Sequence, residues 1–235
     1  MQLQLHALLS PERLADLRQQ LLDPQAPWRP GAETAGWHAR TVKNNRQLDR
    51  SSPLHRRLEE QVRGVLAGHS LLQRAALPLA IHSMRFSRCA AGEGYGLHLD
   101  NAFMAEGRAD LSFTLFLSDP LAYSGGGLLL GGHHHHASGS NPLASGLPAP
   151  EALRLAAGSA VVYPSTELHE VEPVRSGERL VAVGWIQSRV RSAGQRELLF
   201  DLDTARRELF EREGKSGCFE RISRSYTNLL RLWGE

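Results

Sequence analysis

A histidine and an aspartate two positions apart, His98 and Asp100, have the residue types and spacing for metal chemistry. They fall in a segment predicted to be a strand or the end of one, where residues two apart project from the same face. One imidazole and one carboxylate can then bind the same metal ion. His169 is the natural third ligand, because it follows a predicted strand over 160–163 and precedes another. Two histidines and one carboxylate, with the opposite coordination positions open, are the ligand set of non-haem Fe(II) oxygenases.

Arg179 stands ten residues beyond His169, at the start of an apolar strand predicted over 180–186. A guanidinium can hold a carboxylate with two hydrogen bonds, as the binding of a dicarboxylic co-substrate requires. The array therefore predicts 2-oxoglutarate. Each part alone could have a purely structural explanation. The His-x-Asp pair could occur by chance, His169 could cap a turn, and Arg179 could be a solvated charge in a turn. Their order within one strand-rich region favours the enzyme.

Two rival interpretations use the same metal ligands. A non-catalytic jelly-roll iron sensor would keep the histidines and the aspartate, and so would a metal hydrolase on the same fold. Neither needs a clamp for a dicarboxylate, so the presence of Arg179 argues against both.

Composition limits the partners more than the chemistry. The 235 residues carry 27 Lys and Arg against 25 Asp and Glu, a net charge of +2 that favours neither nucleic acid nor an anionic membrane as the main partner. No apolar run approaches the length needed to span a bilayer, and the first residues do not resemble a secretion signal. The two cysteines, Cys89 and Cys218, lie far apart in the sequence and fit a reducing compartment. We expect a cytoplasmic protein.

The surrounding elements change character along the chain. Ser10 and Pro11 predict a helix over 11–22, and Ser52 with Pro53 predicts a second that ends near residue 67. From about residue 79, short apolar runs separated by Gly, Pro and Asp are typical of a β-sandwich or jelly roll. These runs are 81–86, 96–99, 111–117, 128–130, 153–155, 160–163 and 180–186. Beyond residue 187 the pattern is helical again, with a break at 214–217.

Several longer segments resemble one family, the bacterial PKHD-type hydroxylases, which are Fe(II)/2-oxoglutarate dioxygenases linked to iron uptake. The likeness covers nearly the whole chain. It is carried by 42–47 (VKNNRQ), 96–102 (GLHLDNA), 110–120 (DLSFTLFLSDP), 162–165 (VYPS), 185–188 (WIQS), 195–196 (QR) and 198–203 (LLFDLD).

The resemblance implies an α+β chain with a double-stranded β-helix (jelly roll) core. We expect an N-terminal helical support region at 1–78, the dioxygenase domain at 79–188 with an inserted loop at 131–150, and a C-terminal helical tail at 189–235. It implies that His98, Asp100 and His169 hold Fe(II), that Arg179 holds 2-oxoglutarate, and that L-ascorbate is a further cofactor. The tail is a candidate homodimer contact.

The likeness leaves the primary substrate open between peptidyl proline or lysine and a small molecule such as a siderophore. Four polar residues at 43–46 are expected at the substrate mouth. Tyr163 is a candidate hydroxyl for the co-substrate pocket, although a packing role is an alternative. Asn101 and Trp185 are candidates to orient the ligands or to form the pocket wall.

Two features depart from the family pattern. Members usually have Asn-Arg-Tyr where this chain reads Ser87-Arg88-Cys89, which puts a tyrosine contact to the co-substrate in doubt and places a thiol near the iron. The loop at 131–150 is about twenty residues longer than usual and carries His133–His136. We interpret it as a natural insertion, either a linker or a secondary metal site.

Overall fold

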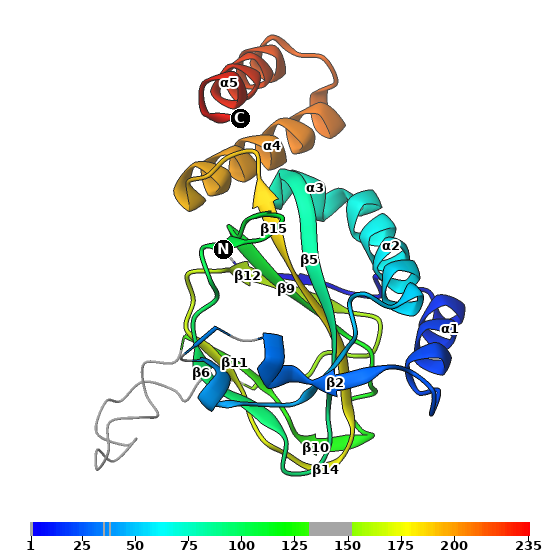
Figure 1. The fold of residues 1–235 in the computed structure, drawn as a ribbon. Coiled ribbons are helices and arrows are strands. Elements are labelled where there is room, and N and C mark those ends of the chain that lie inside the picture. Colours follow the sequence, from blue (N-terminus) through cyan, green and yellow to red (C-terminus); the bar gives the residue numbers. More distant parts are fainter. Residues whose placement is uncertain (1, 35, 38, 132–151) are drawn as a thin grey trace, which may run out of the picture.

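The strands build two antiparallel sheets with a pocket between them. The structure is a computed structural model, and it describes residues 2–34, 36, 37, 39–131 and 152–235. The larger sheet has the strand order β1-β12-β9-β15-β5-β4-β2, and the smaller has the order β11-β13-β6-β3. Two short two-stranded sheets, β10 with β14 and β7 with β8, complete the strands. Figure 1 shows the long strands β5 and β15 running side by side through the body.

The strand bounds are β1 (Leu3–Leu5), β2 (Trp28–Pro30), β3 (Lys43–Asn44), β4 (Arg46–Leu48), β5 (Pro78–Cys89), β6 (Gly94–His98), β7 (Phe103–Met104), β8 (Gly107–Arg108), β9 (Leu111–Phe116), β10 (Tyr123–Gly125), β11 (Leu128–Leu130), β12 (Ala160–Pro164), β13 (His169–Val171), β14 (Val174–Gly177) and β15 (Arg179–Ser188). The helices are α1 (Pro11–Leu21), α2 (Pro53–Gly68), α3 (Ser70–Ala76), α4 (Ala193–Glu213) and α5 (Gly217–Trp233), with short 3-10 turns at Gly31–Thr34 and Ala39–Thr41.

The larger sheet separates an apolar core from the pocket. Alternate residues of a strand point to opposite faces. On β5, Phe86 therefore packs into the core with the first two helices, whereas Arg85 and Ser87 line the pocket. On the neighbouring β15, Ala182 lies in the core and Val183 lines the pocket. The sheet is thus fixed from behind by helices while its front face carries the polar groups.

The first two predicted helices are confirmed as α1 and α2, and both begin at a capping serine followed by proline. The structure also has α3, β2, β3 and β4, which the sequence did not predict. Those strands are short and lack an apolar pattern, and they form through pairing: β4 hydrogen-bonds to β5, β2 to β4 and β3 to β6. The strand predicted at 153–155 is instead an isolated bridge between Leu128 and Leu153.

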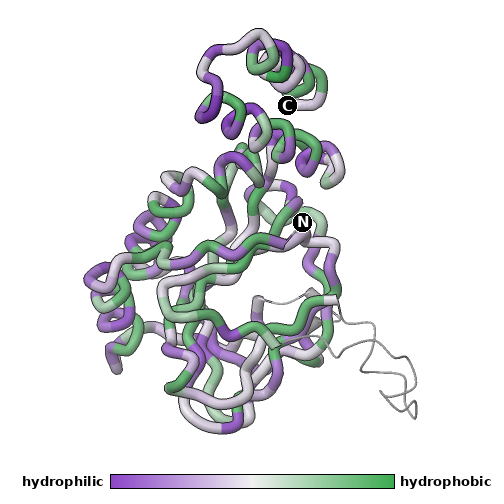
Figure 2. Tube along the Cα trace, turned by 180° about the vertical axis from the view of Figure 1, so that it is seen from behind, coloured by the Kyte–Doolittle hydropathy of each residue, from purple (hydrophilic) through white to green (hydrophobic). Residues whose placement is uncertain are grey.

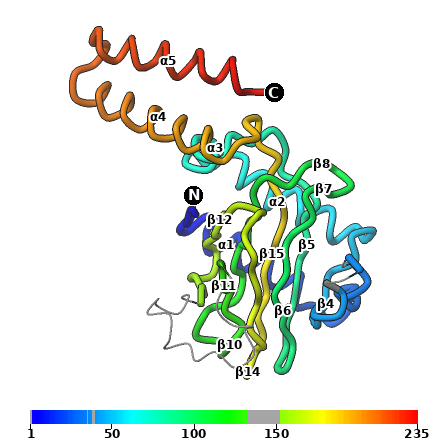
Figure 3. The backbone as a smooth tube through the Cα atoms, turned by 90° about the vertical axis from the view of Figure 1, so that its left-hand side faces the viewer, coloured from blue at the N-terminus to red at the C-terminus, as the bar shows by residue number. Residues whose placement is uncertain are grey.

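The helices α4 and α5 form a hairpin that projects beyond the end of β15 (Figure 3). Its hydrophobic and hydrophilic residues alternate along both helices (Figure 2). The buried Asp203 of α4 pairs with Arg74 of α3 and with Arg206 and Arg207 of its own helix, which fixes the hairpin to the body. None of the described helices has the length and apolar character needed to cross a membrane.

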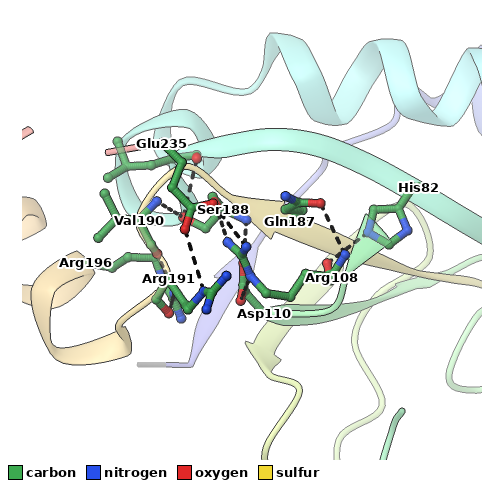
Figure 4. A network of polar contacts seen from close by, with 10 residues as sticks. His82, Arg108, Asp110, Gln187, Ser188, Val190, Arg191, Arg196 and Glu235 are labelled. Carbon is green, nitrogen blue, oxygen red and sulfur yellow. Dashed lines mark hydrogen bonds and ion pairs between the residues drawn. The ribbon is translucent and has the colours of Figure 1, made fainter. Parts of the chain in front are cut away.

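A polar network joins the end of the chain to the strands beside the pocket (Figure 4). Arg108 donates hydrogen bonds to Asp110, to the Ser188 carbonyl and to Glu235. The backbone N–H of Glu235 donates to the Arg189 carbonyl at 2.9 Å. The hairpin therefore leaves β15 and returns to the same end of it.

Candidate active site

His98 and His169 lie directly opposite each other on the antiparallel strands β6 and β13. Their rings are 4.2 Å apart, and Tyr95 stacks on the outer face of His98 at 3.5 Å. Asp100 follows β6 by two residues. One ligand atom from each of His98, Asp100 and His169 lies within 4.8 Å of the others. The structure therefore brings these three predicted residues together, in an arrangement that could hold a metal ion.

The backbone fixes which nitrogen of each histidine faces the cluster. Nδ1 of His98 lies 2.8 Å from the Gly96 carbonyl, and Nδ1 of His169 lies 2.9 Å from the Glu167 carbonyl. A carbonyl oxygen accepts hydrogen bonds, so each Nδ1 carries a proton, and in the neutral tautomer it is Nε2 that offers a lone pair to a metal. Burial, reinforced by the neighbouring His169, lowers the pKa of His98 to about 4. His98 is therefore neutral near pH 7, as metal binding requires.

A serine that the sequence analysis did not single out orients Asp100. Ser112 on β9 donates from Oγ to Oδ2 of Asp100 at 2.6 Å, and its Oγ lies 2.8 Å from the Ser165 hydroxyl. Both serines are buried. The same carboxylate oxygen is 3.8 Å from Nε2 of His169. Hydrogen bonds from behind thus hold the carboxylate against the two imidazoles.

Arg179 begins β15 and is only 3% exposed. Its Nε has no hydrogen-bond partner, and no described carboxylate lies within ion-pair distance of it. Its guanidinium lies 5.7 Å from the centre of the Phe116 ring. A buried cation without an acid is costly, so this site favours an anionic ligand that supplies the missing partner.

Two residues flank Arg179. Cys89 pairs with it across β5 and β15, and burial raises the pKa of the Cys89 thiol. Tyr123 of β10 is buried beside Arg179, and its hydroxyl has no hydrogen-bond partner among the described residues. The sequence analysis missed Tyr123, because the pairing of β10 with β14, just before Arg179, is visible only in the fold.

The other candidates from the sequence fall on the wall of the pocket. Tyr163 on β12 meets the edge of the His169 ring at 5.3 Å, and burial raises the pKa of its hydroxyl. Trp185 and Asn101 also line the pocket, and the buried Nε1 of Trp185 has no hydrogen-bond partner among the residues that the structure describes.

Of the four polar residues at 43–46, the structure brings two to the pocket. Lys43 and Asn45 line it, and Nδ2 of Asn45 donates to the Ser87 hydroxyl at 2.8 Å. Asn44 faces away, toward the Gly92 carbonyl, and Arg46 is exposed with Glu93 3.9 Å away. Alternation along the short strands β3 and β4 accounts for this division. The loop that carries His133–His136 lies outside the described residues.

The comparisons with known proteins agree with this geometry. Residues 84–187 match the model of the 2OG-Fe(II) oxygenase superfamily, and residues 194–235 match the PKHD-type hydroxylase C-terminal domain. A PKHD-type hydroxylase of Synechococcus elongatus is 50% identical over 209 residues, which cover 87% of each chain. One from Acaryochloris marina is 48% identical over 228 residues, 97% of each chain.

A solved structure supports the fold. An oxidoreductase of the 2OG-Fe(II) oxygenase family from Burkholderia pseudomallei is 20% identical, with a TM-score of 0.53 over 82% of this chain and 87% of that chain. The family models together span the pocket strands and the helical hairpin, and the relatives extend over most of the sequence. The chain belongs to the PKHD-type hydroxylases, a family of enzymes within the 2OG-Fe(II) oxygenase superfamily.

Proposed function

We propose that the chain hydroxylates a C–H bond of a primary substrate, consuming 2-oxoglutarate and oxygen and releasing succinate and carbon dioxide. The observation that carries this proposal is a buried, acid-free Arg179 in the same pocket as two imidazoles and a carboxylate. One oxygen atom enters the product and the other enters succinate, so the oxidation of 2-oxoglutarate balances the reaction.

The residues present fit Fe(II) and 2-oxoglutarate. Nε2 of His98, Nε2 of His169 and the Asp100 carboxylate would hold the metal, since two imidazoles and one carboxylate suit non-haem Fe(II). Bound Fe(II) supplies the activation of oxygen that amino-acid side chains cannot provide. Asp100 also argues against a halogenase, in which that position must be vacant for halide.

The chain contributes binding and exclusion of water. Arg179 would grip the far carboxylate of 2-oxoglutarate with two hydrogen bonds. Val181 and Val183 face the pocket along the same strand and present an apolar wall. Tyr163, with its raised pKa, stays neutral and can donate a hydrogen bond from its hydroxyl. Ser112 keeps the Asp100 carboxylate in one orientation.

The finer parts of the assignment are proposals as well. We propose that the two facing sheets form a double-stranded β-helix, as the pocket between antiparallel sheets suggests. Ascorbate as a reductant, a cytoplasmic location and a homodimer through the hairpin rest on the family resemblance and the sequence pattern. An iron sensor and a metal hydrolase remain the rivals, and both leave Arg179 without a role.

The decisive experiment is an anaerobic titration of the metal-free protein with Fe(II) and then 2-oxoglutarate, read by the visible metal-to-ligand charge-transfer band of the chelate. We expect the band in the wild-type protein and its loss in Arg179→Ala at the same co-substrate concentration, with iron binding kept. Arg175→Ala, a change at an exposed arginine of β14, is the matched control. Iron binding without a band at any concentration would favour the sensor or the hydrolase.

The metal ligands are tested separately. His98→Ala should lower the iron affinity at least about 100-fold, because one of three protein ligands is lost, whereas His6→Ala at an exposed position should not. Stoichiometric iron in His98→Ala would refute the ligand set.

A further inference from the structure

The pocket holds two cations in addition to Arg179. Lys43 reaches it from β3 and Arg85 from β5, and both are half-buried. We propose that the primary substrate is an anion, and that its carboxylate, phosphate or sulfate group binds between Lys43 and Arg85. This inference rests on the proposed function, because it names the substrate class of the same site.

The two cations lie apart from the co-substrate clamp. One face of β5 carries Arg85, Ser87 and Cys89. Across β5 and β15, Cys89 pairs with Arg179 and Arg85 pairs with Val183. Positions 85 and 89 are four residues apart, so the two pairs lie about 13 Å from each other along β5. Both carboxylates of 2-oxoglutarate already have partners in the proposed complex, one at the metal and one at Arg179. Lys43 and Arg85 are therefore free for a second ligand.

Neither cation has an acid of its own among the described residues. The Arg85 guanidinium donates to the carbonyls of Ser83 and Met84 at 2.9 and 3.2 Å. The acids whose charges it feels most, Glu106 and Glu59, are already paired with Arg50 and Arg63.

Lys43 is placed similarly. It donates to the Thr34 hydroxyl at 3.1 Å and lies 5.1 Å from the centre of the Tyr95 ring. In the part of the chain that the structure describes, no carboxylate lies within ion-pair distance of Lys43 or Arg85. Burial and the nearby Arg85 together lower the pKa of Lys43 to about 8. Two like charges held close in a partly desolvated pocket are unfavourable unless an anion lies between them.

The charge of the loaded pocket points the same way. Asp100 is the one acid among the described residues that line the pocket, against the three cations Lys43, Arg85 and Arg179. Fe(II) and 2-oxoglutarate cancel each other's charge, so two positive charges remain after both have bound. The unpartnered Nε1–H of Trp185 adds a donor on the same wall. An anionic group with several oxygens can pair with Lys43 and Arg85 and also accept the hydrogen bond from Trp185.

The position suits a role in specificity. Lys43 lies beside Tyr95 in the register of β3 and β6, and the Tyr95 ring stacks on His98. A substrate anchored at Lys43 and Arg85 therefore lies next to the metal cluster. Its anion would fix which C–H bond faces the open coordination positions.

The test is calorimetric titration of inorganic sulfate into anaerobic protein saturated with 2-oxoglutarate and with Fe(II) added as the chloride. We expect one sulfate per chain, with affinity lowered at least tenfold in Lys43→Met and in Arg85→Met. Arg85→Lys keeps the charge and should retain most of the binding. Lys215→Met, at an exposed lysine between α4 and α5, should leave the affinity unchanged.

The proposal would be overturned if the wild-type protein bound no sulfate saturably, or if both methionine variants bound sulfate with the wild-type affinity. So would loss of the charge-transfer band on adding sulfate, because sulfate would then be competing with 2-oxoglutarate. If the band is missing in the wild-type protein before sulfate is added, the proposed function fails, and that outcome is independent of the sulfate isotherm.

Discussion

Cys89 and Arg179 lie directly opposite each other on β5 and β15, and both are almost completely buried at one end of the pocket. The family resemblance led us to expect a tyrosine at position 89. A thiol at this position is much shorter than a phenol. Arg179 still has a phenol as a neighbour, because Tyr123 of β10 places a buried hydroxyl beside it. The proposed co-substrate clamp would thus be built from β15 and β10 as well as from β5.

The Cys89 thiol should be unreactive although it lies near the proposed metal site. Burial raises its pKa, so less thiolate is present at neutral pH and alkylation is slow. Cys218 is exposed and serves as an internal control. Mass spectrometry after a timed iodoacetamide treatment should show Cys218 modified at least about 100-fold faster. Equal rates would mean that the thiol is accessible or activated.

Tyr123→Phe should raise KM for 2-oxoglutarate about tenfold and leave kcat nearly unchanged. The hydroxyl lies beside Arg179, does not line the pocket and has no hydrogen-bond partner among the described residues. We expect the guanidinium to donate to it once 2-oxoglutarate is bound, which would position Arg179 at a gain of about one hydrogen bond to a charged group. Steady-state kinetics at varied 2-oxoglutarate give the two constants separately. Tyr226→Phe in the C-terminal hairpin is the control. A fall in kcat with KM unchanged would contradict the positioning role.

Arg179→Ala should raise KM for 2-oxoglutarate by at least about 100-fold, because two charged hydrogen bonds of roughly 1.5–3 kcal/mol each are lost. Arg179→Lys should recover part of this loss, since it restores the charge without the two-pronged geometry. The measurement is succinate release at varied 2-oxoglutarate. If Arg179→Ala keeps the wild-type KM, the co-substrate carboxylate binds elsewhere.

Sulfate affinity should depend on pH through Lys43. Its pKa is lowered to about 8, so the ammonium is largely charged below that pH and loses its proton as pH rises through it. Sulfate keeps its charge over this range, and Arg85, with a pKa lowered to about 10, is still mainly charged at pH 9. We expect about a tenfold loss of affinity between pH 7 and 9.5. Lys43→Arg should remove most of this dependence, and an unchanged slope in that variant would exclude Lys43 as its source.

The sequence was informative where chemistry depends on short spacing. His98 and Asp100 are neighbours by strand periodicity, and His169 and Arg179 follow from strands with clear apolar patterns. Ser112, Tyr123 and Arg85 were not foreseen. Each reaches the pocket through the register of strands that are distant in sequence, and a serine, a tyrosine or an arginine on a strand carries no local signal of which pocket it will face.

The same reasoning applies to whole elements. Strong caps predicted α1 and α2, and the apolar run at 111–117 predicted the strand that the structure shows as β9. The strands β2, β3 and β4 have no such pattern and depend on tertiary pairing for their stability. The domain bounds at 78 and 188 stay predictions, although β1 to β4 show that residues before 79 contribute strands to both sheets.

The α4–α5 hairpin leaves β15 and, through Glu235, returns to the same end of that strand. A segment whose two ends meet at one point can be lengthened or labelled at its far turn without pulling on the strands that it joins. The turn around Lys215 is therefore a natural place for a fluorescent reporter or an affinity handle.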